Sequence, residues 1–171
     1  MFSEEIRALS RTLLDACRTK GVHIVTAESC TGGLIAAALT EIAGSSEVFE
    51  RGFVTYQNEA KAEDLGVLEQ TLLIHGAVSE PVARQMAEGA LNRSASQVSV
   101  AVTGVAGPGG GSVEKPVGLV HITSASTGGE TLHLRCEFGD IGRERIREAT
   151  VSKALNLLAE AVGRYSSNNS A

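Results

Sequence analysis

A serine, a tyrosine and a lysine with the chemistry of a nucleophile and its base follow two short β-prone runs of the chain. Ser29 comes after the run 22–27, whereas Tyr56 and Lys61 come at and after the end of the run 49–56. A serine hydroxyl attacks when a base removes its proton, and lysine is such a base where burial or nearby positive charge lowers its pKa. A tyrosine hydroxyl can relay or orient that proton. Taken alone, Lys61 is an ordinary solvated helix lysine. The prediction of a nucleophile with its base therefore requires that Ser29, Tyr56 and Lys61 lie close together in the fold.

The segment 28–33 reads Glu-Ser-Cys-Thr-Gly-Gly and leads into an Ala- and Leu-rich helix expected at 34–42. Unpaired N–H groups and the dipole at a helix amino end favour an anion, and Gly32 and Gly33 let a ligand approach the backbone. The turn therefore predicts a phosphate site or an oxyanion site beside Ser29. The commoner explanation of such a turn is that Ser29 or Thr31 caps the helix.

The two neighbours of Ser29 each allow two interpretations. Cys30 is a candidate nucleophile, because a helix amino end lowers thiol pKa, but a cysteine in this setting is more often a small buried apolar residue. We favour the buried residue. Glu28 could orient a partner or bind a substrate hydroxyl, or it could simply stabilise the helix dipole.

Two further segments are candidates for binding an anion. The glycine-rich stretch 103–112, which includes Thr103, Gly104 and Gly107, is expected to be neither helix nor strand interior. It matches neither the P-loop nor the dinucleotide-binding pattern, so it is either a surface turn or a nest of backbone donors. Arg143 and Arg147 belong to an arginine cluster at a helix start, where they could bind a phosphate monoester or form salt bridges with nearby glutamates.

Periodicity and capping signals predict the order of the elements. Helices are expected at 3–19, 34–42, 58–65 (capped by Asn58), 79–91 and 141–162. Strands are expected at 22–27, 49–56, 98–102, 117–124 and 131–138, the last two joined by a glycine turn as a hairpin. Alternating strands and helices followed by one hairpin predict an α/β fold, a three-layer α/β/α sandwich with a mixed, mostly parallel five-stranded sheet. One domain is expected over 1–165, with a polar tail at 166–171. Ligands of such folds bind beyond the carboxyl ends of the parallel strands.

Composition limits the classes of function. The 171 residues are 43% hydrophobic and 20% charged, which is typical of one globular domain. A net charge of −5 argues against binding to nucleic acid. No apolar run approaches the roughly 20 residues of a membrane span, no leader is recognisable, and the cysteines are few and widely spaced. We therefore expect a cytoplasmic protein with no membrane partner. The histidines lack the spacing of metal ligands, so no metal site is expected.

The chain resembles the family of CinA carboxy-terminal domains along nearly its whole length. The resemblance rests on four blocks in order, which are Thr26-Ala27-Glu28-Ser29-Cys30-Thr31-Gly32-Gly33-Leu34-Ile35, Gly52-Phe53-Val54-Thr55-Tyr56 with Asn58-Glu59-Ala60-Lys61, Gly76-Ala77-Val78-Ser79-Glu80, and Thr103-Gly104-Val105-Ala106-Gly107-Pro108 with Lys115-Pro116-Val117-Gly118.

The resemblance implies an amidohydrolase that converts nicotinamide mononucleotide to nicotinate mononucleotide and ammonia, without a metal or another cofactor. It implies Ser29 as nucleophile, Lys61 as general base and Tyr56 as an assisting hydroxyl. It also implies a homo-oligomer. The other candidate residues are expected to bind the substrate; they are Glu28, Cys30, Thr31, Gly32, Gly33, Asn58, Thr103, Gly104, Gly107, Arg143 and Arg147. A binding module without catalysis and an amidase for a different amide stay open as alternatives.

Overall fold

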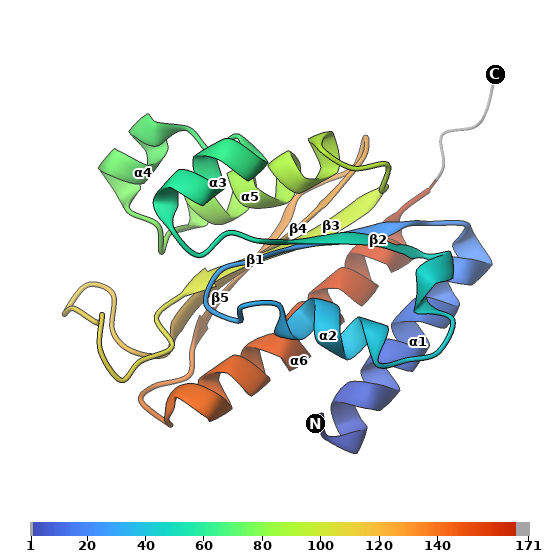
Figure 1. Cartoon of the computed structure of the whole chain (residues 1–171), viewed down its shortest axis with the longest axis horizontal. Coiled ribbons are helices and arrows are strands. Elements are labelled where there is room, and N and C mark those ends of the chain that lie inside the picture. Colours follow the sequence, from blue (N-terminus) through green and yellow to red (C-terminus); the bar gives the residue numbers. More distant parts are fainter. Residues whose placement is uncertain (1, 167–171) are drawn as a thin grey trace.

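The structure is a computed structural model that describes residues 2–166, in which a five-stranded sheet lies between two layers of helices (Figure 1). Met1 and residues 167–171, which make up most of the expected polar tail, lie outside the described residues. The strands stand in the order β2-β1-β3-β4-β5. Their bounds are β1 Ile24–Glu28, β2 Phe49–Val54, β3 Val98–Gly104, β4 Leu119–Ser126 and β5 Leu132–Glu137.

The sheet is mixed, as predicted. Strand β1 pairs in parallel with both β2 and β3, whereas β4 is antiparallel to β3 and to β5. Four strands therefore run in one direction and β4 runs against them. The last two strands form the predicted hairpin, and β1, β2 and β3 end at one edge of the sheet.

Helices cover both faces of the sheet (Figure 1). Helices α1 (Glu4–Lys20), α2 (Leu34–Thr40) and α6 (Arg143–Arg164) pack on one face over the larger apolar cluster. Helices α3 (Asn58–Leu65), α4 (Glu69–His75) and α5 (Glu80–Asn92) lie on the other face. A short 3-10 helix, η1 (Ser45–Glu47), precedes β2. The predicted three-layer sandwich is confirmed.

Serine side chains cap two of the helices predicted from the sequence. The hydroxyl of Ser3 accepts from the Ile6 N–H at the start of α1, and Ser79 accepts from the Val82 N–H at the start of α5. Gly21 ends α1 in the left-handed region, with φ of 65°. Such a φ costs glycine little because it has no Cβ.

The structure corrects several local predictions. Asn58 does not cap α3: it is the first helical residue, and Gln57 stands at the cap position without a side-chain hydrogen bond. Helix α4 was not predicted, whereas Thr103 and Gly104, expected in a loop, are the last residues of β3 and pair with β4. Antiparallel hydrogen bonding to β4 extends β3 into the glycine-rich stretch.

Helix α5 lies very close to its neighbours, which places tight limits on side-chain size. The Ser99 hydroxyl on β3 donates to the Ala87 carbonyl of α5 over 2.8 Å. A Cβ added to Gly89 would stand 1.9 Å from the carbonyl oxygen of Leu65, the last residue of α3. Glycine at 89 therefore allows α5 to cross the end of the helix that carries Lys61.

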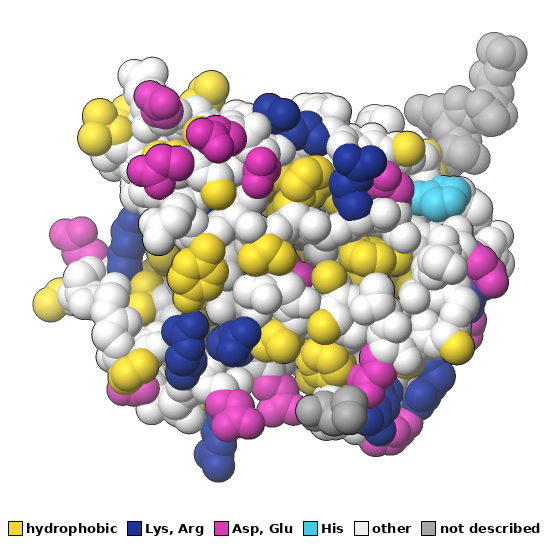
Figure 2. All heavy atoms as spheres, in the orientation of Figure 1, with side chains coloured by type: hydrophobic (Ala, Val, Ile, Leu, Met, Phe, Trp, Pro, Cys, Tyr) yellow, Lys and Arg dark blue, Asp and Glu magenta, His cyan; other side chains and the backbone are white. Residues whose placement is uncertain are grey.

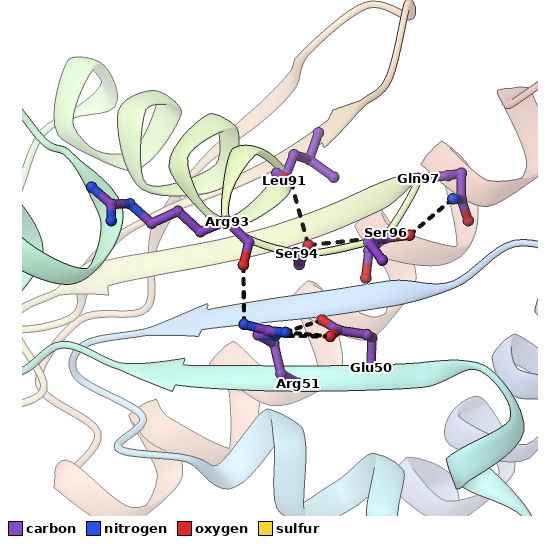
Figure 3. Close-up of polar contacts among 8 residues, drawn as sticks. Glu50, Arg51, Leu91, Arg93, Ser94, Ser96 and Gln97 are labelled. Atoms are coloured by element: carbon purple, nitrogen blue, oxygen red, sulfur yellow. Dashed lines mark hydrogen bonds and ion pairs between the residues drawn. The ribbon is translucent and has the colours of Figure 1, made fainter.

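The edge strand β2 is tied to the loop between α5 and β3 (Figure 3). The Arg51 side chain donates to the Arg93 carbonyl over 3.1 Å and also pairs with the neighbouring Glu50. Within the loop, the Ser96 N–H donates to the Ser94 hydroxyl over 3.3 Å. These contacts fix one end of β2, while its other end leads toward Tyr56 and Lys61.

We predict that Gly89→Ala lowers the free energy of unfolding by about 1–3 kcal/mol, because the new methyl group must displace the Leu65 backbone. Gly163→Ala on α6 is the matched control. Its Cβ would meet nothing within 4 Å, so the higher helix propensity of alanine should raise stability by up to about 1 kcal/mol. Urea unfolding curves of both variants test this, and equal effects of the two substitutions would contradict it.

Candidate active site

The candidate site lies at the carboxyl ends of β1, β2 and β3, the left-hand end of the sheet in Figure 1. The Ser29 N–H donates to the Val102 carbonyl of β3 over 3.1 Å, so the backbone of β1 continues straight into Ser29. The Thr55 N–H donates to the Glu28 carbonyl over 2.9 Å in the same way. The parallel pairing of β1 with β2 and β3 thus holds both sequence segments next to each other.

Lys61 and Ser29 meet directly. Lys61 Nζ lies 3.0 Å from Ser29 Oγ, 2.7 Å from the Thr55 carbonyl oxygen and 3.2 Å from the Tyr56 carbonyl oxygen. Ser29 is 9% exposed and Lys61 is only 1% exposed, although Lys61 starts on a helix at the surface of the sandwich. The lysine is therefore not the solvated helix residue that its sequence context alone would suggest.

Burial changes the acid–base chemistry of Lys61. Removal from water disfavours the ammonium form and lowers the pKa of Lys61 from 10.5 to about 8, while the neighbouring Cys30 acts in the opposite direction. Within residues 2–166 no carboxylate forms an ion pair with this lysine. An amine with a pKa near 8 is neutral in an appreciable fraction of molecules at neutral pH, which suits a general base.

Glu28 holds the start of α2 and is not a pocket residue. Its side chain is fully buried, and its carboxylate accepts from the N–H groups of Gly33, Ile35 and Ala36 over 2.9–3.1 Å. Gly33 is the cap residue, with φ of 95°, so neither Ser29 nor Thr31 caps this helix. The amino end of α2 is thus already occupied by an anion, which leaves these N–H groups unavailable to a substrate.

The residues between Ser29 and Gly32 form a tight turn. The Gly32 N–H donates to the Ser29 carbonyl over 3.0 Å. Within residues 2–166 no hydrogen bond joins the N–H group of Cys30 or Thr31 to another residue. These are the free backbone donors nearest to the Ser29 hydroxyl in sequence.

Cys30 is a buried apolar residue, as favoured from the sequence. It is 6% exposed and belongs to the larger apolar cluster. Burial raises the pKa of its thiol to about 12, even though nearby N–H and cationic groups act in the opposite direction. The thiolate that nucleophilic attack requires is therefore scarce at neutral pH.

The Tyr56 hydroxyl forms its hydrogen bond with Arg143 and not with Ser29 or Lys61. It accepts from Arg143 Nη2 over 3.0 Å, and Arg143 Nη1 donates to the Gly107 carbonyl over 2.9 Å. Only the main-chain carbonyl of Tyr56 contacts Lys61. Arg143 thus bridges the glycine-rich stretch and the segment after β2 through neutral acceptors. In Figure 2, basic side chains gather over the first turns of α6, beside hydrophobic side chains near the end of β2.

A pocket of about 270 Å³ opens over Ser29 and Lys61. Eight of the residues proposed from the sequence line it, namely Ser29, Cys30, Tyr56, Lys61, Thr103, Gly104, Gly107 and Arg143. Sequence reasoning missed other lining residues, namely Ala77, Val78, Val105, Ala106, Gly109 and Gly110. The first four lie in blocks that carry the family resemblance, which was the available signal.

The remaining proposed residues do not line this pocket. They are Glu28, Thr31, Gly32, Gly33, Asn58 and Arg147. The Thr103 hydroxyl, although in the pocket wall, donates to the Ala77 carbonyl over 2.8 Å. Arg147 donates through Nη2 to the Thr31 carbonyl over 2.7 Å, so it contacts the turn without lining the pocket.

Residues outside the pocket include one unexpected pair. His121 Nδ1 and His133 Nε2 lie 3.0 Å apart, although their sequence positions gave no sign of a contact. In residues 2–166 no three His, Cys, Asp or Glu side chains gather in a way that could hold a metal ion. None of the helices in that range is both long and apolar enough to span a membrane.

Comparison with known proteins agrees with the fold and with the family resemblance of the sequence. Residues 6–162 match the model of the CinA C-terminal domain. A relative from Escherichia coli (strain K12), named nicotinamide-nucleotide amidohydrolase PncC, is 49% identical over 92% of this chain and 95% of its own length. A CinA-like protein from Chloroherpeton thalassium is 50% identical over 84% of this chain and 34% of its own length.

Solved structures give the same result. The crystal structure of the competence/damage inducible protein CihA from Agrobacterium tumefaciens superimposes with a TM-score of 0.93 at 55% identity, covering 96% of this chain and 99% of that chain. A CinA superfamily protein from Escherichia coli superimposes with a TM-score of 0.87 at 33% identity over 94% of this chain and 93% of that one. The chain belongs to the CinA C-terminal domain family.

Proposed function

We propose that this protein hydrolyses the carboxamide of nicotinamide mononucleotide to nicotinate mononucleotide and ammonia, with Ser29 as nucleophile and Lys61 as base. The single observation that carries the proposal is the 3.0 Å contact between Ser29 Oγ and the buried Lys61 Nζ. The names of the PncC relatives supply the substrate. The contact between the two side chains supports acyl transfer through a serine ester as the type of reaction.

The contacts of Lys61 favour a neutral amine whose lone pair faces Ser29. A neutral amine has two hydrogens and one lone pair, whereas a carbonyl oxygen can only accept. If the hydrogens go to the carbonyls of Thr55 and Tyr56, the lone pair is left for the Ser29 hydroxyl. The main chain therefore orients the base without a carboxylate, which would have raised its pKa.

In the first half of the reaction Lys61 takes the Ser29 proton and Oγ attacks the carboxamide carbon. The carbonyl oxygen becomes an oxyanion, for which the N–H groups of Cys30 and Thr31 are the proposed donors. The Lys61 ammonium then gives its proton to the amide nitrogen, the C–N bond breaks, and ammonia leaves. In the second half Lys61 deprotonates a water molecule that attacks the ester carbon, the bond from that carbon to Oγ breaks, and the proton returns to Ser29 as nicotinate mononucleotide is released.

Arg143 is the residue proposed to receive the substrate phosphate. It lines the pocket, and its hydrogen bonds in the described structure go to a hydroxyl and a carbonyl. Its positive charge is thus not cancelled by a carboxylate among residues 2–166. A guanidinium at the mouth of a pocket matches the geometry of a phosphate monoester. The Tyr56 hydroxyl would then orient Arg143 rather than assist Ser29 directly.

We predict that Ser29→Ala and Lys61→Met each lower kcat for ammonia release from nicotinamide mononucleotide by about 10³-fold or more, because each removes a member of one functional unit. Lys153→Met, on the exposed side of α6, is the control and should keep the parental rate. Ammonia is measured with a coupled assay, and the acid product is identified by chromatography. Parental turnover by Ser29→Ala would show that the nucleophile is wrong. Saturable binding by the parental protein without turnover would instead indicate a binding module.

We also predict that kcat/KM rises about tenfold per pH unit below pH 8 and levels off above it. The sign follows from the lowered pKa of Lys61: the active form of the base is the neutral amine, which is lost as the pH falls below about 8. In protein labelled with ¹³C-lysine, one side chain should titrate near pH 8 and its signal should be missing from Lys61→Met. A flat profile between pH 6 and pH 9 would exclude Lys61 as the base.

A further inference from the structure

Arg147 contacts the turn behind Ser29 but does not line the pocket. It lies one helical turn after Arg143 on α6, and its Nη2 donates to the Thr31 carbonyl over 2.7 Å. Its Nε is buried and has no partner among residues 2–166. An unsatisfied buried donor costs stability, so a contribution to function would explain why an arginine stands here.

The bond from Arg147 is the first of two that run through the turn to the residue after the nucleophile. The Thr31 carbonyl belongs to the same peptide group as the Gly32 N–H, and that N–H donates to the Ser29 carbonyl over 3.0 Å. The Ser29 carbonyl in turn shares its peptide group with the Cys30 N–H. Two planar peptide groups therefore connect the guanidinium to the Cys30 N–H.

We propose that Arg147 is a positioning residue for the hydrolysis, which fixes and polarises the Cys30 N–H through the peptide groups Thr31–Gly32 and Ser29–Cys30. Hydrogen bonds in a chain strengthen one another, and one that begins at a cation is stronger than a neutral one. The Cys30 N–H becomes a better donor to the oxyanion when the carbonyl of its own peptide group accepts a strong bond. The proposal rests on the proposed function, because an oxyanion forms only if Ser29 attacks a carbonyl.

The electrostatics of the turn support this arrangement. The positive charge of Arg147 acts to lower the pKa of the Cys30 thiol, although burial raises that pKa by more. From the other side, the Glu28 carboxylate accepts from the N–H groups that begin α2 and so fixes the end of the turn. The segment 29–32 is thus held between a buried anion and a cation, neither of which lines the pocket.

The test uses Arg147→Met, Arg147→Gln and Arg147→Lys, with Arg145→Met as the control on the exposed side of the same helix. We expect Arg147→Met to lower kcat for nicotinamide mononucleotide by about 10- to 100-fold, less than the loss of a direct oxyanion donor, with KM within about twofold of the parental value. Arg147→Lys should recover part of kcat because it restores a cationic donor, and Arg147→Gln should recover less. Arg145→Met should leave kcat unchanged.

Hydrogen–deuterium exchange gives a readout that does not need turnover. In Arg147→Met, amides in segment 29–33 should exchange faster while those of β3 and α1 keep parental rates. Parental kcat in Arg147→Met, an equal loss in Arg145→Met, a rise in KM with kcat unchanged, or unaltered exchange at 29–33 would each overturn the proposal.

The test also decides the question if Arg147→Met does not fold or if the parental protein is inactive. If Arg147→Met does not fold, Arg147→Lys and Arg147→Gln are compared at matched melting temperature, and equal kcat values contradict the polarising role. If the parental protein releases no ammonia from nicotinamide mononucleotide, the proposed function fails, whereas the exchange experiment still decides whether Arg147 holds the turn.

Discussion

The site depends on one constraint: the amine of Lys61 is buried against Ser29 and two carbonyls, with no counter-ion among residues 2–166. Burying an ammonium without a carboxylate is costly, and the protein relieves that cost by shifting the equilibrium toward the neutral amine. The carbonyls of Thr55 and Tyr56 accept two of its hydrogens in either form, and the Ser29 hydroxyl accepts the third in the ammonium form. Because the carbonyl positions are fixed by the chain leaving β2, the base is oriented by the same backbone that forms the pocket wall.

The arrangement of charge around the turn follows from this constraint. Glu28 stands one residue before Ser29, so an unscreened carboxylate there would be expected to stabilise the Lys61 ammonium. Its oxygens instead accept three N–H groups of α2, and burial, not Glu28, sets the direction of the Lys61 pKa shift. The sequence pattern suggested a helix end open to a substrate anion. In the structure Glu28 already accepts from the N–H groups at that helix end. The N–H groups within the turn are therefore the donors that are left to bind an oxyanion.

Sequence patterns predicted the fold where local signals and tertiary packing agree. Helices α1 and α5 begin at serine caps and were located to within a residue, and the hairpin followed from its glycine turn. Helix α4 was missed because it is seven residues long, has no side-chain cap, and leaves Leu73 and Ile74 exposed, so it lacks an amphipathic pattern. Thr103 and Gly104 were assigned to a loop because glycine breaks strands on average, whereas pairing with β4 overrides that preference here.

The site shows a similar division between what residue types reveal and what only the fold determines. Ser29, Lys61 and Arg143 have side chains with obvious chemistry, and the carboxyl ends of the predicted parallel strands indicated where Ser29 and Lys61 could meet. The partners that tune them are mostly main-chain groups, such as the carbonyls of Thr55, Gly107 and Thr31, and any residue type supplies a carbonyl. The sequence therefore cannot mark them, and it could not reveal that the Tyr56 hydroxyl turns to Arg143 instead of Ser29. Residue identity selects the reacting groups in this fold, while backbone geometry decides what each of them does.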